Sequence, residues 1–237
     1  MVEGVADVDV AVRDAATVML VRDRADGVEV FMLRRSAELD FVAGAYVFPG
    51  GAVDDADRHS RFEAVCDGLS DPEASAVLGI PSGGLAFWVA AVRECFEEAG
   101  VLLARHSGGD VVSFADPVTE KRFTAYREAE TRLVELCRVE ALLLTTDRIH
   151  YHSHWITPVG PPRRYDTRFF IAAAPPAQEP LHDGRETVAS IWVRPSDALA
   201  RHEAGELQLI LPTIRTLESI AAFSTTADLL GTPNLKR

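Results

Sequence analysis

Residues 85–100, LAFWVAAVRECFEEAG, constrain the fold of this chain more than any other segment. At about 3.6 residues per turn, Glu94, Glu97 and Glu98 share an arc of about 100° on a helix. The opposite side of the same helix carries apolar residues, namely Trp88, Val92, Cys95, Phe96 and Ala99. Gly100 is typical of a helix C-terminus. The segment therefore predicts a helix with a buried apolar back and a carboxylate front.

The carboxylate front calls for compensation of its charge. Like charges one turn apart repel by roughly a few tenths of a kcal/mol per pair, and carboxylates near a helix C-terminus also oppose the helix dipole. Arg93 can pair with Glu97 four residues on. A divalent cation would supply further compensation, because Mg²⁺ takes oxygen ligands and bridges carboxylates to substrate phosphates. The alternative, from spacing alone, is a solvated acidic helix face.

Composition narrows the class of protein. The 237 residues include 24 basic and 36 acidic side chains, a net charge of −12. Such a balance argues against nucleic-acid and membrane-surface partners and suits an enzyme that collects divalent cations for a small-molecule substrate. Three cysteines without a CxxC spacing argue against a disulfide scaffold. The sequence shows no signal-peptide pattern and no membrane-length apolar run, so the expected location is cytoplasmic. A homodimer is a candidate assembly.

Strand and helix patterns alternate along the chain and predict an α+β fold. A hairpin turn is expected at Asp26-Gly27, because Gly accepts positive φ. Expected strands span 17–22, 28–34, 45–48, 101–104, 150–157, 168–173 and 190–193, and expected helices span 85–99, 119–144, 195–203 and 213–223. Residues 15–225 form the predicted domain, with a frayed segment at 1–14 and a tail at 226–237. Residues 58–84, rich in Pro and Gly, are expected to form a compact inserted excursion of short helices near the active-site rim.

Residues 93–101, RECFEEAGV, resemble the second half of the nudix box, REUxEExGU, at every charged and glycine position. Phe48-Pro49-Gly50-Gly51 resembles the loop that opens this box, and Asp57 takes the place of its first glutamate. Between Asp57 and Arg93 lie 35 residues, where the usual box has seven. An interrupted box of this kind resembles a subgroup that includes an animal peroxisomal coenzyme A diphosphatase and bacterial relatives.

The resemblance implies a nudix fold, an α/β/α sandwich around a mixed sheet with an insertion inside the box. It also implies hydrolysis of a diphosphate linked to another moiety, with Mg²⁺ or Mn²⁺ as cofactor. Carried over residue by residue, Glu97 and Glu98 are metal ligands, and Glu94 is a ligand or the general base. Arg93 belongs to the catalytic group, and Asp57 and Glu186 are candidates for further metal ligands.

A second resemblance concerns the substrate. Arg35-Ser36, Gly44 and the Phe48–Gly51 loop match the spacing of a coenzyme A signature, although Asp40 replaces its basic residue and Leu33 its Thr. Coenzyme A or acyl-coenzyme A is the first expectation. ADP-ribose or a dinucleotide such as NADH is the alternative, as is a non-catalytic binding module, which would be expected to lose box glutamates. The expected substrate-binding residues are Arg35, Gly50, Gly51, Arg163, Arg164 and Arg168.

The alternation His150, His152 and His154 predicts a shared face if the segment is a regular strand. Histidines on one face can bind zinc through neutral imidazoles. The other interpretations are a polar sheet face and histidines that line the substrate site.

Overall fold

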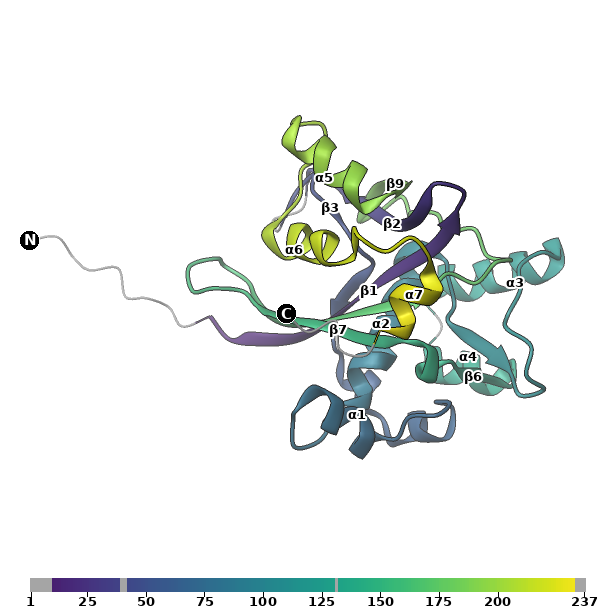
Figure 1. The fold of residues 1–237 in the computed structure, drawn as a ribbon. Coiled ribbons are helices and arrows are strands. Elements are labelled where there is room, and N and C mark those ends of the chain that lie inside the picture. The colour runs from purple at the N-terminus through teal and green to yellow at the C-terminus, as the bar shows by residue number, and fades with distance from the viewer. Residues whose placement is uncertain (1–9, 39–41, 131, 233–237) are drawn as a thin grey trace, which may run out of the picture.

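In the computed structural model, which describes residues 10–38, 42–130 and 132–232, a mixed seven-stranded sheet forms the centre (Figure 1). The order is β3-β2-β1-β8-β7, with β4 paired to β1 and β9 paired to β2. Strand β1 runs parallel to β8 and antiparallel to β2 and β4. The strands are β1 (Val12–Arg24), β2 (Gly27–Arg35), β3 (Tyr46–Val47), β4 (Gly50–Ala52), β7 (His150–Ile156), β8 (Arg164–Ala173) and β9 (Thr187–Val193).

The central strand β1 is apolar on both faces. Ala16, Val18 and Leu20 belong to one core cluster, whereas Met19 and Val21 belong to the other. Because alternate side chains of a strand point to opposite faces, this sequence requires cover on both sides. The expected hairpin is confirmed, since Arg24 pairs with Gly27, whose φ is 121°.

Helices cover both faces of the sheet. Helix α2 (Leu85–Ala99) packs against one face, and α5 (Pro195–Glu203), α6 (Leu211–Ile220) and α7 (Thr226–Gly231) supply buried residues to the cluster on the other. Figure 1 shows α5 and α6 on one side of β1 and α1 on the other. The predicted α/β/α sandwich is confirmed. Among the described residues, no helix is both long and apolar enough to cross a lipid bilayer.

The insertion at 58–84 forms the short helices that were expected. They are η2 (Ser60–Ala64) and α1 (Asp71–Leu78), and η1 (Asp55–Arg58) leads into the segment. The segment is more than an excursion at the rim, however, because Phe62 and Ala74 are buried in the same cluster as α2. Leu144 donates a backbone hydrogen bond of 2.7 Å to Val65 and accepts one of 2.9 Å from Asp67. The insertion thus adds to the core beside a second, two-stranded sheet, β5 (Ala104–His106) with β6 (Leu142–Leu144).

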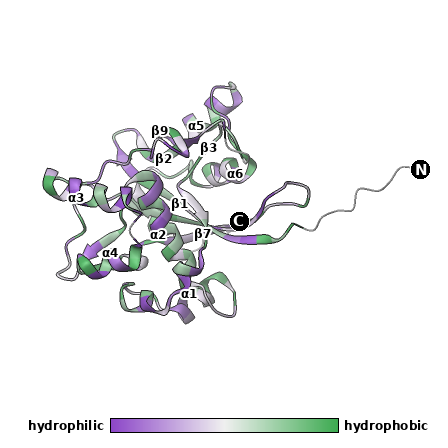
Figure 2. Cartoon of the chain, turned by 180° about the vertical axis from the view of Figure 1, so that it is seen from behind, coloured by the Kyte–Doolittle hydropathy of each residue, from purple (hydrophilic) through white to green (hydrophobic). Residues whose placement is uncertain are grey.

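The predicted long helix at 119–144 is wrong. The structure has α3 (Pro117–Glu128), α4 (Leu133–Val139) and then β6. Glu130 has a φ of 51°, which a continuous helix does not allow. The charges in this segment alternate without an apolar stripe, so the sequence pattern gave no sign of the break. Figure 2 shows that α3 is largely hydrophilic, as befits an outer helix.

Several segment boundaries also differ, and three of the differences affect how the chain is divided. The strand expected at 101–104 begins only at Ala104. Residues 12–14 of the predicted frayed segment lie in β1 and pair with β8, whereas residues 1–9 lie outside the described residues. The predicted tail contains α7, which is held by the buried Leu229. All three cysteines lie in the described part of the chain and are free thiols.

Candidate active site

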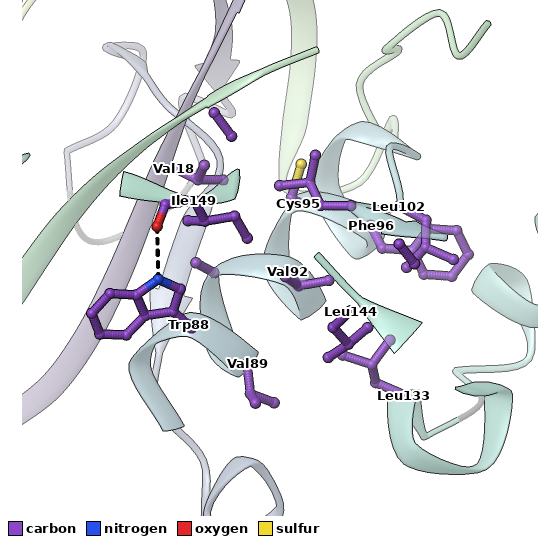
Figure 3. Packing of buried hydrophobic residues seen from close by; sticks show 14 of the residues in the cluster. Val18, Trp88, Val89, Val92, Cys95, Phe96, Leu102, Leu133, Leu144 and Ile149 are labelled. Carbon is purple, nitrogen blue, oxygen red and sulfur yellow. Dashed lines mark hydrogen bonds between the residues drawn. The ribbon is translucent and has the colours of Figure 1, made fainter. Parts of the chain in front are cut away.

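The apolar side of helix α2 is held in the core, and this fixes the direction of its carboxylates. Val92, Cys95 and Phe96 are buried in the core cluster, as Figure 3 shows. The Trp88 indole N–H donates a hydrogen bond of 2.8 Å to the Ile149 carbonyl, which ties the first half of the helix to the segment before β7. Gly100 ends the helix in the left-handed region with a φ of 69°. Rotation of α2 about its axis is therefore blocked, and its glutamates face a defined direction.

The glycine loop of β4 lies directly against these glutamates. The Gly50 N–H donates a hydrogen bond of 2.9 Å to Oε2 of Glu98. A Cβ on Gly51 would lie 2.3 Å from Oε1 of Glu94, and a Cβ on Gly50 would lie 2.5 Å from the Ala16 carbonyl oxygen. Because these separations are shorter than real Cβ contacts, a side chain at Gly50 would collide with the backbone of β1, whereas one at Gly51 would displace the Glu94 carboxylate from its position.

Arg93 organises the carboxylates around it. Its guanidinium contacts Glu94 at 2.8 Å and Glu97 at 3.1 Å, which confirms the predicted pair four residues apart. It also donates to the Ala52 carbonyl at 2.8 Å. One side chain thus connects the helix to the glycine loop.

Asp57 is the buried partner of Arg93. Nε and Nη2 of Arg93 each lie 2.9 Å from one of its carboxylate oxygens, a bidentate pair. The Asp54 N–H also donates to Oδ2 of Asp57 at 2.8 Å. The side chain of Asp57 is only 1% exposed. With both oxygens engaged, Asp57 fixes Arg93, and this geometry disfavours the predicted role as a metal ligand.

Burial makes the ionised glutamates unfavourable. It raises the pKa of Glu94 to about 7, with Glu97 and Asp57 adding repulsion while Arg93 opposes the rise. It raises the pKa of Glu98 to about 8, with repulsion from Glu94 next. Burial also raises the pKa of Glu97, against the effect of Arg93. Desolvated carboxylates that repel one another favour a nearby cation.

Two more predicted residues lie close to Glu98. Arg35 and Glu186 both act on its pKa through their charges, Arg35 lowering it and Glu186 raising it. The Ser36 N–H donates to the Glu186 carbonyl at 2.8 Å, which joins the end of β2 to the segment before β9. Asp183 accepts hydrogen bonds from the N–H groups of Arg185, Glu186 and Thr187 and so shapes this segment. The structure therefore brings Arg35 and Glu186 toward the glutamate front.

The arginines of the β7–β8 ribbon lie apart from the glycine loop. Arg168 is buried, pairs with Asp166 and lies with its guanidinium carbon 5.5 Å from the Phe87 ring centre. Arg164 donates to the carbonyls of Thr157 and Val10, at 3.2 and 3.4 Å, and Arg163 precedes β8. Arg168 is in register with Ala16, which in turn pairs with Gly51, so β1 separates it from the glycine loop. These contacts favour a role in holding the ribbon.

The three histidines do not share a face. A register shift between Tyr151 and Ser153 makes a bulge at His152. Nε2 of the buried His152 lies 3.0 Å from the Ser219 hydroxyl on α6, whereas Nε2 of His154 lies 2.5 Å from Asp166. The predicted shared face is wrong, because one extra residue reverses the alternation. It leaves the zinc interpretation without support.

The site offers candidate metal-ligand oxygens, but they do not form a complete coordination shell as they stand. Within the described ranges, no three His, Cys, Asp or Glu side chains are arranged to hold an ion as they stand. The Glu97 carboxylate, for example, accepts a hydrogen bond of 3.1 Å from Arg93. The set nevertheless fits a hard divalent cation in its chemistry, since Glu94 and Glu98 offer buried oxygen donors whose ionised forms are disfavoured by desolvation despite the contacts of Arg93 and Gly50.

Sequence reasoning missed one residue at the site. Arg127 of α3 donates to the backbone carbonyls of Glu97 and Glu98. The acceptors are main-chain oxygens 30 and 29 positions away, so no side-chain motif marks the contact. Only the placement of α3 could show it.

Known proteins resemble both the sequence and the fold. The NUDT19 Nudix domain profile matches residues 70–220, which include α2 and Glu186. "Acyl-coenzyme A diphosphatase NUDT19" of Gallus gallus is 28% identical over 85% of this chain and 63% of the relative, and its Homo sapiens counterpart is 30% identical over 86% and 64%. The chain thus spans less than two thirds of these relatives.

A solved structure extends the likeness to the whole fold. The crystal structure of a NUDIX hydrolase from Alicyclobacillus acidocaldarius covers 97% of this chain and 100% of its own, with a TM-score of 0.77 and 26% identity. Together with the interrupted box and its glycine loop, the profile match shows that this chain belongs to the nudix hydrolases, in the family of the NUDT19 Nudix domain.

Proposed function

We propose that this protein hydrolyses the diphosphate linkage of a substrate in which the diphosphate is joined to another moiety. One observation carries the proposal: Glu94 and Glu98 are buried side by side against the Gly50-Gly51 loop, and burial disfavours their ionised forms more than the contacts of Arg93 and Gly50 favour them. An acidic pair of this kind, at the edge of a loop without side chains, is suited to a cation and to the phosphates that it accompanies.

The proposed ligands for Mg²⁺ or Mn²⁺ are Glu94, Glu97 and Glu98, with Glu186 as a further candidate. A bound divalent ion would neutralise the diphosphate and lower the pKa of water. The residues of the chain orient these ligands. Arg93 orients Glu94 and Glu97, Gly50 fixes one carboxylate oxygen of Glu98, and Gly51 leaves room in front of Glu94. Glu94 serves as a ligand or as the general base that accepts a proton.

For the substrate we propose coenzyme A or acyl-coenzyme A. The names of the relatives support this choice, and so does the partial signature from Arg35 to Gly51. Arg35 acts electrostatically on Glu98 and is therefore our candidate for a phosphate contact in the site. Asp40, the residue that departs from the signature, lies outside the described residues. The three ribbon arginines are weaker candidates, because Arg164 and Arg168 are already engaged within the ribbon.

A phosphate-release screen tests the proposal. Purified protein is assayed with coenzyme A, an acyl-coenzyme A, ADP-ribose, NADH and nucleoside triphosphates, each with Mg²⁺ and with Mn²⁺. We expect turnover of coenzyme A species that is lost on chelation and in Glu98→Gln. Preferential turnover of ADP-ribose or NADH would move the assignment to the alternative substrate class. Binding of these compounds without turnover by the metal-loaded protein would instead favour a binding module.

A further inference from the structure

The C-terminal end of α2 is held from outside the helix. Arg127 donates from Nε to the Glu97 carbonyl at 2.8 Å and from Nη2 to the Glu98 carbonyl at 3.1 Å. The Leu181 N–H donates to the next carbonyl, that of Ala99, at 3.0 Å. Three successive main-chain oxygens, which a helix end leaves unpaired, thus find donors on α3 and on the segment that leads to Glu186.

The position of Arg127 opposes two unfavourable effects. The carbonyls at a helix C-terminus carry partial negative charge, and the carboxylates of Glu97 and Glu98 add to it. An arginine there is favourable both as a hydrogen-bond donor and as a cation. Because the guanidinium is a rigid planar fork, its two bonds also fix the orientation of two consecutive peptide groups. Those peptide groups belong to the two residues that form the proposed ligand pair.

The capping and packing of α3 place Arg127 at the end of α2. Asp116 caps the start of α3 by accepting from the Thr119 N–H at 2.9 Å, and Phe123 anchors the helix in the core. Arg127 follows Phe123 by four residues and therefore lies on the same side of α3. It also lies against Gly100, where a Cβ would come within 2.9 Å of Nη1 of Arg127. Glycine at the end of α2 is favoured by its φ of 69°, and the missing Cβ lets the Arg127 guanidinium lie close to the helix end.

We propose that Arg127 is a positioning residue for the metal site. It holds the backbone of Glu97 and Glu98 in the orientation from which their carboxylates bind the cation. The inference rests on the proposed function, because it assigns Arg127 a role toward those two ligands. In the hydrogen bonds described above, Arg127 binds the main-chain oxygens of Glu97 and Glu98, not their carboxylates. Its effect on the cation therefore passes through these two glutamates.

The test measures Mn²⁺ binding directly, by titration calorimetry or by the Mn²⁺ electron paramagnetic resonance signal, on initially metal-free protein. We expect Arg127→Met to weaken Mn²⁺ affinity by about 10- to 100-fold, as is common for residues that orient metal ligands. Arg127→Lys should fall between this variant and wild type, because one ammonium group does not reproduce the fork. Arg122→Met is the matched control, since Arg122 is on the same helix but pairs with Glu140 at 3.1 Å.

Steady-state rates and melting temperatures complete the design. Arg127→Met should lower kcat with little change in the KM of the substrate, whereas Arg122→Met should leave Mn²⁺ affinity and kcat near wild type. A lower melting temperature with unchanged Mn²⁺ affinity and kcat in both Arg127 variants would make Arg127 structural and overturn the inference, while the proposed function stands. Failure of wild-type protein to bind Mn²⁺ or to hydrolyse any diphosphate would overturn the proposed function itself. Arg127→Lys keeps the test decisive if Arg127→Met does not fold.

Discussion

The N–H of Gly50 and the Oε2 of Glu98 are joined by a hydrogen bond of 2.9 Å across 48 positions of sequence. This contact closes the two halves of the box onto each other even though the insertion separates them. Asp57 and Arg93 do the same across 36 positions. Chain length between two such points matters little once a folded segment fills it, because loop-closure entropy grows only slowly with length. The interrupted box therefore keeps its internal contacts.

The first prediction concerns the glutamates of α2. Glu97→Gln and Glu98→Gln should each lower kcat by orders of magnitude and weaken Mn²⁺ binding, because a neutral amide is a poor substitute for an anionic oxygen on a hard cation. Far-ultraviolet circular dichroism should show an intact fold. Glu120→Gln, an exposed site in the first turn of α3, is the control. Wild-type turnover by either glutamine variant in a metal-buffered assay would remove the metal assignment.

The second prediction concerns Gly51. In Gly51→Ala the new methyl group would lie 2.3 Å from Oε1 of Glu94, so the carboxylate must move. We expect a strong loss of kcat with little change in the free energy of unfolding, because the methyl group meets only the end of the flexible Glu94 side chain and no backbone. The control is Gly108→Ala, where the methyl group meets nothing within 4 Å. Full activity in Gly51→Ala, measured beside urea unfolding, would mean that the position of Glu94 is not critical.

A third prediction separates the two possible roles of Asp57. If Asp57 is the partner of Arg93, Asp57→Asn removes the bidentate anionic partner, leaves Glu94 and Glu97 to compensate the guanidinium, and should cost about 1.5–3 kcal/mol of unfolding free energy. Mn²⁺ affinity of the folded fraction should then fall only modestly. A metal ligand would give the reverse, with a small change in stability and a large loss of affinity. Urea unfolding and Mn²⁺ titration on the same sample distinguish the two cases.

The fourth prediction is a pH dependence from His152. Burial lowers the pKa of this imidazole to about 4 from its usual 6.5. Below pH 6.5 the unfolded chain gains a proton that the folded protein refuses until about pH 4. Stability from this residue is therefore complete above pH 6.5 and is lost as the pH falls toward 4. The slope is at most about 1.4 kcal/mol per pH unit.

Substitution isolates this contribution. His152→Gln should flatten the acid side of the stability profile, measured by urea unfolding from pH 4 to 8, while His59→Gln, at an exposed position, should not. The buried glutamates have the opposite sign. Their raised pKa values make the metal-free protein less stable as the pH rises from the ordinary value of 4.5 to about 8, so only the difference between variant and wild type is diagnostic. Parallel profiles for wild type and His152→Gln would contradict the assignment.

Several features followed from sequence because they are local. The bounds of α2 match the predicted helix, since apolar spacing and Gly100 define it without help from the rest of the chain. The hairpin at Gly27 is equally local. The histidine alternation misled because a single-residue bulge at His152, whose imidazole contacts Ser219, reverses the face of every residue beyond it.

By itself, then, the sequence determined the helix, its carboxylate front and the glycine loop, because each is encoded in the spacing of neighbouring residues. The tertiary structure decided what that front faces. It placed Gly50, Arg35 and Glu186 around Glu98, gave Asp57 to Arg93, kept the ribbon arginines on the far side of β1 and brought Arg127 to the helix end. These contacts join main-chain and side-chain atoms that lie tens of residues apart. No local pattern records them, because only the packing of the core fixes which distant segments meet.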